Sequence, residues 1–205
     1  FMVTPQNNTI VYWYAAVFSQ DKGLAHAQAD QPYFKIRMYD QNCNEIMCAH
    51  YDVDATAAFN GTVAGFNTKD TTYDIFGDQE TWVYHDWTQI FIPLINNVGQ
   101  NVTLLYETSD CDAGGHFGYA YVAADCGPFS VITSSPYVCG SNTVTLSAPA
   151  GAQTYSWSTS GGGSIVSGAT TPTITINHGG SYTVTMTTPG NSGQTCTFSI
   201  DTVIP

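Results

Sequence analysis

The apolar residues of this chain recur with the period of β-strands, and this alternation most constrains the fold. Residues 33–39 alternate inward and outward positions, with Lys35 and Arg37 on the same side. Only five residues are leucine, and no long window has the 3.6-residue period of a helix. Turn residues rich in glycine and asparagine separate the apolar runs. The pattern therefore predicts an all-β chain.

The candidate strands fall into two groups. The first group predicts a two-sheet jelly-roll β-sandwich over residues 1–127, and the second predicts a smaller sandwich over residues 128–205. The expected strands of the first group are 9–18, 33–39, 46–53, 87–94, 101–108 and 117–123. Those of the second group are 143–148, 153–159, 172–177, 181–188 and 195–203.

Charge divides the chain at the same place. All four basic residues and fifteen of the sixteen acidic ones precede position 127, and Asp201 is the only charged residue after it. This break indicates two modules with different surfaces and favours a secreted, modular protein. The net charge of −12 argues against nucleic acid and anionic lipid as partners. Divalent cations and neutral glycan or protein partners remain compatible with it.

No apolar run is long enough to span a membrane, so we expect no membrane insertion. The chain has no initiator methionine, signal peptide or lipidation motif. We therefore expect an excised piece of a longer extracellular polypeptide.

The six cysteines are even in number and can pair in sequence order within each module. An even count favours disulfides and an oxidising compartment, whereas reduced, buried thiols are the alternative. A zinc site is disfavoured because no C-x-x-C pair is present. The predicted pairs are Cys43–Cys48, Cys111–Cys126 and Cys139–Cys196.

Several motifs of the first half resemble a jelly-roll module of very large surface proteins from gliding bacteria that use type IX secretion. The motifs are residues 1–7, 12–15, 20–23, 31–34 and 110–121. In the second half, Tyr155-Ser156-Trp157 and residues 180–184 resemble the PKD/immunoglobulin-like repeats that commonly follow such modules. The resemblance implies a cell-surface adhesin for attachment or gliding motility. It also implies neighbouring repeats of the same polypeptide as partners.

Acidic residues near the end of the first module form the candidate metal site. A Cys111–Cys126 bond would bring Asp110, Asp112 and Asp125 together, and like charges at close range require a compensating cation. Carboxylate and carbonyl oxygens suit a structural Ca²⁺ ion, whereas Asx-turns to backbone N–H groups are the alternative. Asp52 and Asp54 share one strand face and are interpreted as solvated.

Aromatic residues in the first module form the candidate ligand site. Trp82, Tyr84, His85 and Trp87 could line a groove on which sugar rings stack, or the tryptophans could fill the core. His116 lies in a glycine-rich segment at a strand start and could face the same ligand. A glycan or other surface polymer is the expected partner.

No constellation in the sequence supports catalysis. His116 has no serine or cysteine nucleophile in a recognisable setting. Glu80 and Glu107 invite a glycosidase hypothesis, which needs two carboxylates about 5–9 Å apart, but nothing else supports it. We therefore expect a non-enzymatic fragment of a large adhesin, with a calcium-stabilised jelly roll on an immunoglobulin-like stalk. The alternative is a carbohydrate-binding accessory module of a secreted polysaccharide-degrading enzyme.

Overall fold

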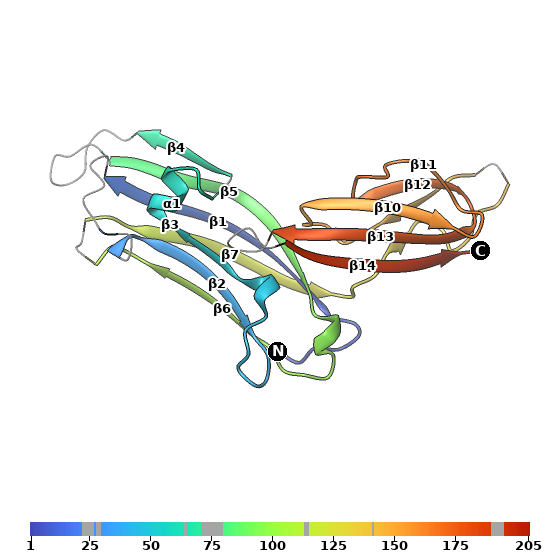
Figure 1. Cartoon of the computed structure of the whole chain (residues 1–205), viewed down its shortest axis with the longest axis horizontal. Coiled ribbons are helices and arrows are strands. Elements are labelled where there is room, and N and C mark those ends of the chain that lie inside the picture. The colour runs from blue at the N-terminus through green and yellow to red at the C-terminus, as the bar shows by residue number, and fades with distance from the viewer. Residues whose placement is uncertain are drawn as a thin grey trace. The chain divides into compact units, whose positions relative to one another are not determined.

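The computed structural model describes residues 1–21, 27, 30–63, 65–70, 80–112, 115–140, 142–189 and 195–205, and only the backbone of residues 20, 21, 80 and 189. The chain is all-β, as predicted, and divides into two compact units (Figure 1). Unit 1 comprises Phe1, Tyr12–Gln89 and Asn101–Ala124. Unit 2 comprises Met2–Val11, Ile90–Gln100 and Asp125–Pro205. The predicted boundary after Gly127 stays a prediction.

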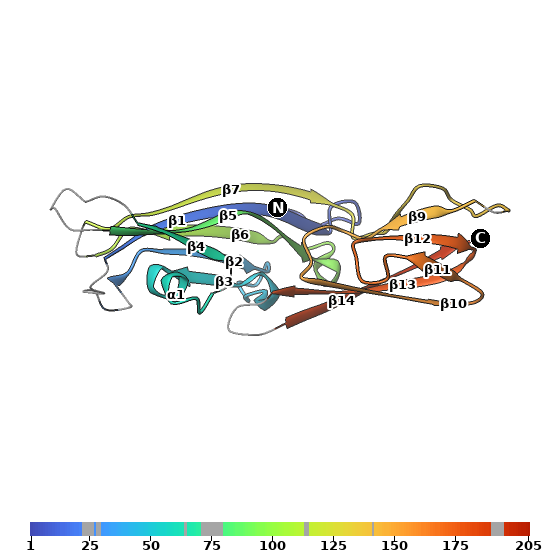
Figure 2. The same ribbon diagram turned by 90° about the horizontal axis from the view of Figure 1, so that it is seen from above.

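Two antiparallel sheets form the first part of the chain. One sheet has the order β4-β5-β1-β7, and the other has the order β3-β2-β6. Figure 2 shows β1 and β7 in one layer with β2 and β3 in the other. The first sheet contains β4 (Phe66–Asp70), β5 (Glu80–Pro93), β1 (Thr9–Asp21) and β7 (Gly118–Gly127). The second contains β3 (Tyr51–Asp54), β2 (Tyr33–Tyr39) and β6 (Thr103–Ser109).

Aromatic side chains fill the space between these sheets in unit 1. Tyr14 of β1 packs on Phe34 of β2 with ring centroids 5.7 Å apart, and on Tyr51 of β3 at 5.1 Å. The Tyr14 hydroxyl donates to the Tyr51 hydroxyl at 3.0 Å. Burial raises the pKa of both phenols, so they stay neutral hydrogen-bonding groups inside the core.

Two further sheets make up the second part of the chain. They have the orders β10-β13-β14 and β11-β12-β9-β8. The first contains β10 (Thr154–Ser160), β13 (Gly180–Pro189) and β14 (Thr195–Ile204). The second contains β11 (Ser164–Ser167), β12 (Thr173–His178), β9 (Val144–Ser147) and β8 (Ile132–Thr133). Trp157 and Tyr182 are buried in the core between them.

Some short elements were not predicted. Helix α1 (Ala55–Phe59) follows Asp54, whose carboxylate accepts a hydrogen bond from the Ala57 N–H at 2.7 Å and so caps the helix. The expected strand 46–53 instead contains the 3₁₀ turn η2 (Met47–Ala49) and β3. A second 3₁₀ turn, η3 (Ile95–Asn97), follows β5. No helix in the described part of the chain is long and apolar enough to cross a membrane.

Candidate functional site

The outer side of sheet β4-β5-β1-β7 carries exposed aromatic residues. Along β7, Gly118 is buried and Ala120 is half-buried, while the alternate Tyr119 and Tyr121 are 58% and 63% exposed. Strand residues two apart face the same side, so the two tyrosines point to solvent together. Their rings lie about 7 Å apart along the strand by this repeat.

Strands β5 and β1 place further rings on the same side. Trp82 of β5 is 39% exposed, and Tyr84 is half-buried on the same side two residues later. Trp13 of β1 is also half-buried and alternates with the buried Tyr12 and Tyr14. With Phe117, which contacts rings of this group, these residues form what we call the aromatic face: Trp13, Trp82, Tyr84, Phe117, Tyr119 and Tyr121.

Contacts within the aromatic face hold its rings in place. The Phe117 ring packs edge-to-face on Trp82, with centroids 5.8 Å apart, and against Tyr119 at 5.0 Å. The Phe117 N–H donates to the Ser19 hydroxyl at 2.8 Å, and the Phe117 carbonyl accepts from the Ser19 N–H at 3.0 Å. Rings already ordered by such contacts lose little conformational freedom when a ligand binds.

The start of β7 is built for close approach of neighbouring backbone. A Cβ atom at Gly118 would lie 2.7 Å from the Ser109 carbonyl, so a side chain would displace the strand. The Gly118 N–H donates to the Asp110 carboxylate at 3.0 Å. Asp110 therefore anchors the strand that carries Tyr119 and Tyr121.

The predicted ligand residues do not all lie on the same side of the sheet. Trp82 and Tyr84 belong to the aromatic face. His85 faces inward instead, with its ring 4.9 Å from Phe66 and 5.2 Å from Tyr14, because it occupies the alternate position of β5. The predicted grouping of all five residues in one groove is therefore wrong for His85. The alternative that tryptophans fill the core is also wrong, because Trp82 and Trp87 are exposed.

His116 lies in the segment before β7. Its backbone N–H points to the Cys111 sulfur at 3.4 Å, and its carbonyl accepts from the Cys111 N–H at 3.2 Å. The residue is half-buried.

Four residues of the aromatic face were not predicted as ligand residues: Trp13, Phe117, Tyr119 and Tyr121. The signal for Tyr119 and Tyr121 was nevertheless present in the sequence. Residues with small side chains, Gly118 and Ala120, alternate with the large rings. Small residues at the inward positions leave the rings on the outer side of the sheet.

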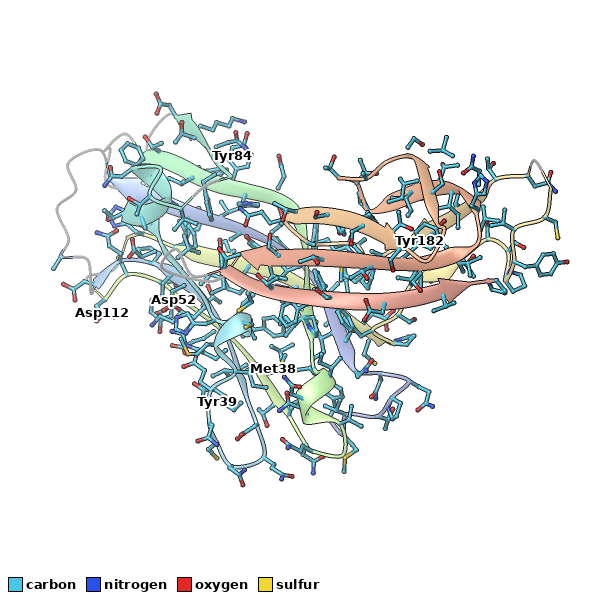
Figure 3. The ribbon with its side chains drawn as sticks, turned by 45° about the vertical axis from the view of Figure 1, so that its right-hand side comes forward. Met38, Tyr39, Asp52, Tyr84, Asp112 and Tyr182 are labelled. Atoms are coloured by element: carbon cyan, nitrogen blue, oxygen red, sulfur yellow. The ribbon has the colours of Figure 1, made fainter. Side chains whose placement is uncertain are left out.

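The outer side of sheet β3-β2-β6 is charged instead. Arg37 donates to both carboxylate oxygens of Asp52, at 2.5 and 2.6 Å, and its Nε lies 3.3 Å from Glu45. The ring nitrogens of His50 lie 2.6 Å from Glu45 and 3.3 Å from Asp52. We call this group the charged cluster: Arg37, Glu45, His50 and Asp52. Figure 3 shows its Asp52 and, on the other sheet, Tyr84.

The interpretation of Asp52 and Asp54 as solvated is therefore wrong. Burial alone would raise the pKa of Asp52, but the hydrogen bonds and charge of Arg37 outweigh it and hold the pKa below the ordinary 3.8. Asp54 caps α1. Both carboxylates line a cavity of about 240 Å³ with Tyr33 and Lys35. The Lys35 ammonium lies 3.7 Å above the Tyr33 ring, and the Tyr33 hydroxyl donates to Glu107.

The glycosidase hypothesis gains no support from these contacts. Glu107 is exposed and accepts the Tyr33 hydroxyl. The side chain of Glu80 lies outside the part of the chain that the structure describes, so the structure gives no distance between the Glu80 and Glu107 carboxylates.

The predicted disulfide pairs are wrong. Cys43, Cys111, Cys126 and Cys139 are free, whereas Cys48 and Cys196 are disulfide-bonded. A disulfide requires Cα atoms about 4.4–6.8 Å apart, and sequence order did not predict which cysteines meet this condition. The disulfide-bonded state of Cys48 and Cys196 still favours an oxidising compartment.

Strand length explains two of the missing pairs. Cys111 lies by the start of β7, whereas Cys126 is eight residues along that strand from Gly118, a distance of about 26 Å. Cys139 follows Val138, whose N–H donates to the carbonyl of Pro205 at 3.3 Å, beyond the end of β14. Cys196 lies at the opposite end of β14, about 26 Å from residue 204.

The first pair is separated by a turn. Cys43 lies at the tip of the turn that the Tyr39–Glu45 bridge closes, with φ of 63°. Cys48 lies beyond this bridge in η2. The two cysteines therefore extend from opposite sides of the bridge.

The three carboxylates predicted to bind calcium do not form one cluster. Asp125 lies seven residues along β7 from Gly118, about 23 Å away, and accepts from the Cys126 N–H at 2.8 Å. Asp110 binds the Gly118 N–H, and Asp112 is exposed. Among the described residues, no group of three or more histidine, cysteine, aspartate or glutamate side chains is arranged to hold a metal ion.

Comparisons with known proteins agree with the second half of the prediction. No curated protein and no solved structure matches the chain. Residues 127–202 match the family model described as a PKD-like domain. Such domains are typical of extracellular proteins and are typically non-catalytic. The second part of the chain, with its two antiparallel sheets around Trp157, is therefore similar to a PKD-like domain.

Proposed function

We propose that the chain is a non-enzymatic binding segment of a large extracellular bacterial adhesin. The aromatic face carries this proposal, because contiguous exposed apolar surface on a soluble domain marks an interaction site. Its most exposed members, Tyr119 and Tyr121, are 58% and 63% exposed, so most of each ring is accessible to a ligand. Attachment of cells to a surface, or gliding over it, is the role that such a face would serve.

The PKD-like region supports the same proposal as a spacer. Asp201 is its only charged side chain, and its hydroxyl-rich strands pair with each other through contacts such as Thr154–Thr187 at 2.6 Å. A neutral, polar module can recur along a polypeptide without accumulating repulsion between copies. Neighbouring repeats of the same polypeptide are therefore the expected flanking partners.

Attachment of the whole chain to a surface tests the proposal. Beads coated with the chain should adhere to cells or to the surfaces on which the producing cells grow. A variant with Trp82→Ala, Tyr119→Ala and Tyr121→Ala should lose this adhesion. Tyr137→Ala is the matched control, because Tyr137 is a 55% exposed ring in the PKD-like region. Equal adhesion of the triple variant and the wild type would refute the proposal.

A carbohydrate-binding accessory module of a secreted polysaccharide-degrading enzyme is the second candidate. The same aromatic face favours it, because tyrosine and tryptophan combine an apolar ring with a polar edge. The two candidates differ in the remainder of the polypeptide, which would contain either many repeats or one catalytic domain. Sequencing the complete gene distinguishes them.

We also propose that Asp110 and Asp112 of unit 1 bind a structural Ca²⁺ ion. Calcium that binds the folded state raises the melting temperature by mass action. Melting curves with calcium and with chelator, for the wild type and Asp112→Asn, measure this effect. Identical curves for the wild type in both conditions would remove calcium from the proposed function.

A further inference from the structure

The aromatic face has a chemistry that narrows the class of its ligand. Its six residues contribute three phenol hydroxyls, two indole N–H groups and no ionisable side chain that is charged at neutral pH. On the adjoining strand β4, Lys69 pairs with Trp82 and Asn67 pairs with Tyr84. Lys69 therefore lies at the margin of the aromatic face, and the exposed Asp86 follows two residues after Tyr84 on β5.

The rings of the aromatic face share one side of a single sheet. The rings come from three neighbouring strands of one sheet, β5, β1 and β7, and strands lie about 4.8 Å apart. On strand β1, Trp13, Ala15 and Val17 take the same side as these rings. Phe117, which directly precedes β7, packs on Trp82 of β5 with ring centroids 5.8 Å apart, so the rings of the outer strands come into contact.

From this geometry we infer that the aromatic face binds an uncharged polysaccharide whose sugar rings are linked equatorially, such as a β-linked glucan or chitin. This inference rests on the proposed function and names its ligand. Equatorial substituents leave axial C–H bonds on both flat sides of each sugar ring. These weakly positive hydrogens match the negative faces of aromatic rings, while tyrosine hydroxyls can bond the sugar hydroxyls at the edges.

The net charge of the chain disfavours anionic polymers. The chain has sixteen acidic and four basic residues, so an acidic polysaccharide or a nucleic acid would be repelled. Protein interfaces are also enriched in tyrosine and tryptophan, usually together with arginine. The six residues of the aromatic face include no arginine. Neutral rings on one side of a sheet suit a ligand with a repeating, uncharged surface, and a protein partner is the outcome that the test below separates from it.

Sedimentation of the full chain with insoluble polysaccharide tests the inference. Microcrystalline cellulose and chitin should both be tried, and the wild type should bind at least one of them. Tyr119→Ala/Tyr121→Ala should raise the half-saturating concentration roughly 5- to 150-fold, because two stacked rings are removed. Tyr137→Ala should leave it unchanged. Binding should persist in 1 M NaCl, where charge pairing at the surface is screened.

The controls separate this inference from the proposed function. Both tyrosines are exposed, so circular dichroism should show the double variant folded like the wild type. Absence of binding to both polymers, or binding that the double variant retains, would overturn the inference. The same holds for preferential binding to alginate or to protein-coated beads. If cell adhesion still depends on the aromatic face in those cases, the proposed adhesin function stands with another ligand.

Discussion

The two outer sheet surfaces of unit 1 share a strand periodicity but differ in chemistry. On β2, buried residues alternate with outward Lys35 and Arg37, and the outward charges find partners on neighbouring segments. On β7, small inward residues alternate with Tyr119 and Tyr121, whose rings stay exposed. Burial patterns alone place both sets on a surface. The charged side chains of the charged cluster pair with one another. In the aromatic face, Tyr119 and Tyr121 instead remain exposed, so they can contact a ligand.

Of the substitutions that test this difference between the two surfaces, one in the charged cluster should lower the free energy of unfolding most. Arg37→Met should lower the free energy of unfolding by about 1–3 kcal/mol, because it removes the charged hydrogen bonds to Asp52 and the ion pair with Glu45. Denaturant unfolding followed by circular dichroism measures this loss. Lys69→Met is the matched control on the other sheet, and it should cost less than about 0.5 kcal/mol because Lys69 is exposed. Equal effects of the two variants would show that Arg37 does not stabilise the fold.

The free energy of unfolding measured over a range of pH tests the Arg37–Asp52 pair through a smaller effect. The folded-state pKa of Asp52 lies below the ordinary value of 3.8. The stabilisation from its pair with Arg37 is therefore fully present when the pH is above 3.8. It is lost as pH falls through the folded-state pKa. The stability difference between the wild type and Arg37→Met should therefore shrink as the pH falls below about 4. A difference that grows on acidification would mean that another group controls it.

The smallest expected effect belongs to the aromatic face. Tyr121→Ser should change the free energy of unfolding by less than about 0.5 kcal/mol, because the Tyr121 ring is 63% exposed. Thermal melting of the two proteins side by side measures this. A loss comparable to that of Arg37→Met would mean that the tyrosine is structural, and the contrast between the two surfaces would disappear.

The fold class followed from local pattern because the period of two in 33–39 and in 181–188 belongs to each segment by itself. Burial confirms it, with Phe34, Ile36 and Met38 inside and Lys35 and Arg37 outside. Helix α1 was not predicted because it has only five residues and begins where the Asp54 carboxylate caps its first turn. So brief a segment has no periodicity to detect.

The candidate site was only partly predictable. Trp82 and Tyr84 were named from their aromatic neighbours, but alternation along β5 turns His85 inward, where it packs on Phe66. Tyr119 and Tyr121 were read only as part of a strand. Their membership of the site depends on β7 lying beside β1 in the same sheet as β5, and no local pattern contains that order.

The sequence by itself therefore determined the all-β class, the PKD-like character of residues 127–202 and the neutral surface of that region, because these depend on composition and local period. Tertiary structure alone decided which cysteines bond, which carboxylates pair and which rings share a surface. Each of these is a distance between segments far apart in the chain. Cys111 and Cys126 flank one strand in sequence, yet the length of an extended strand separates them by about 26 Å.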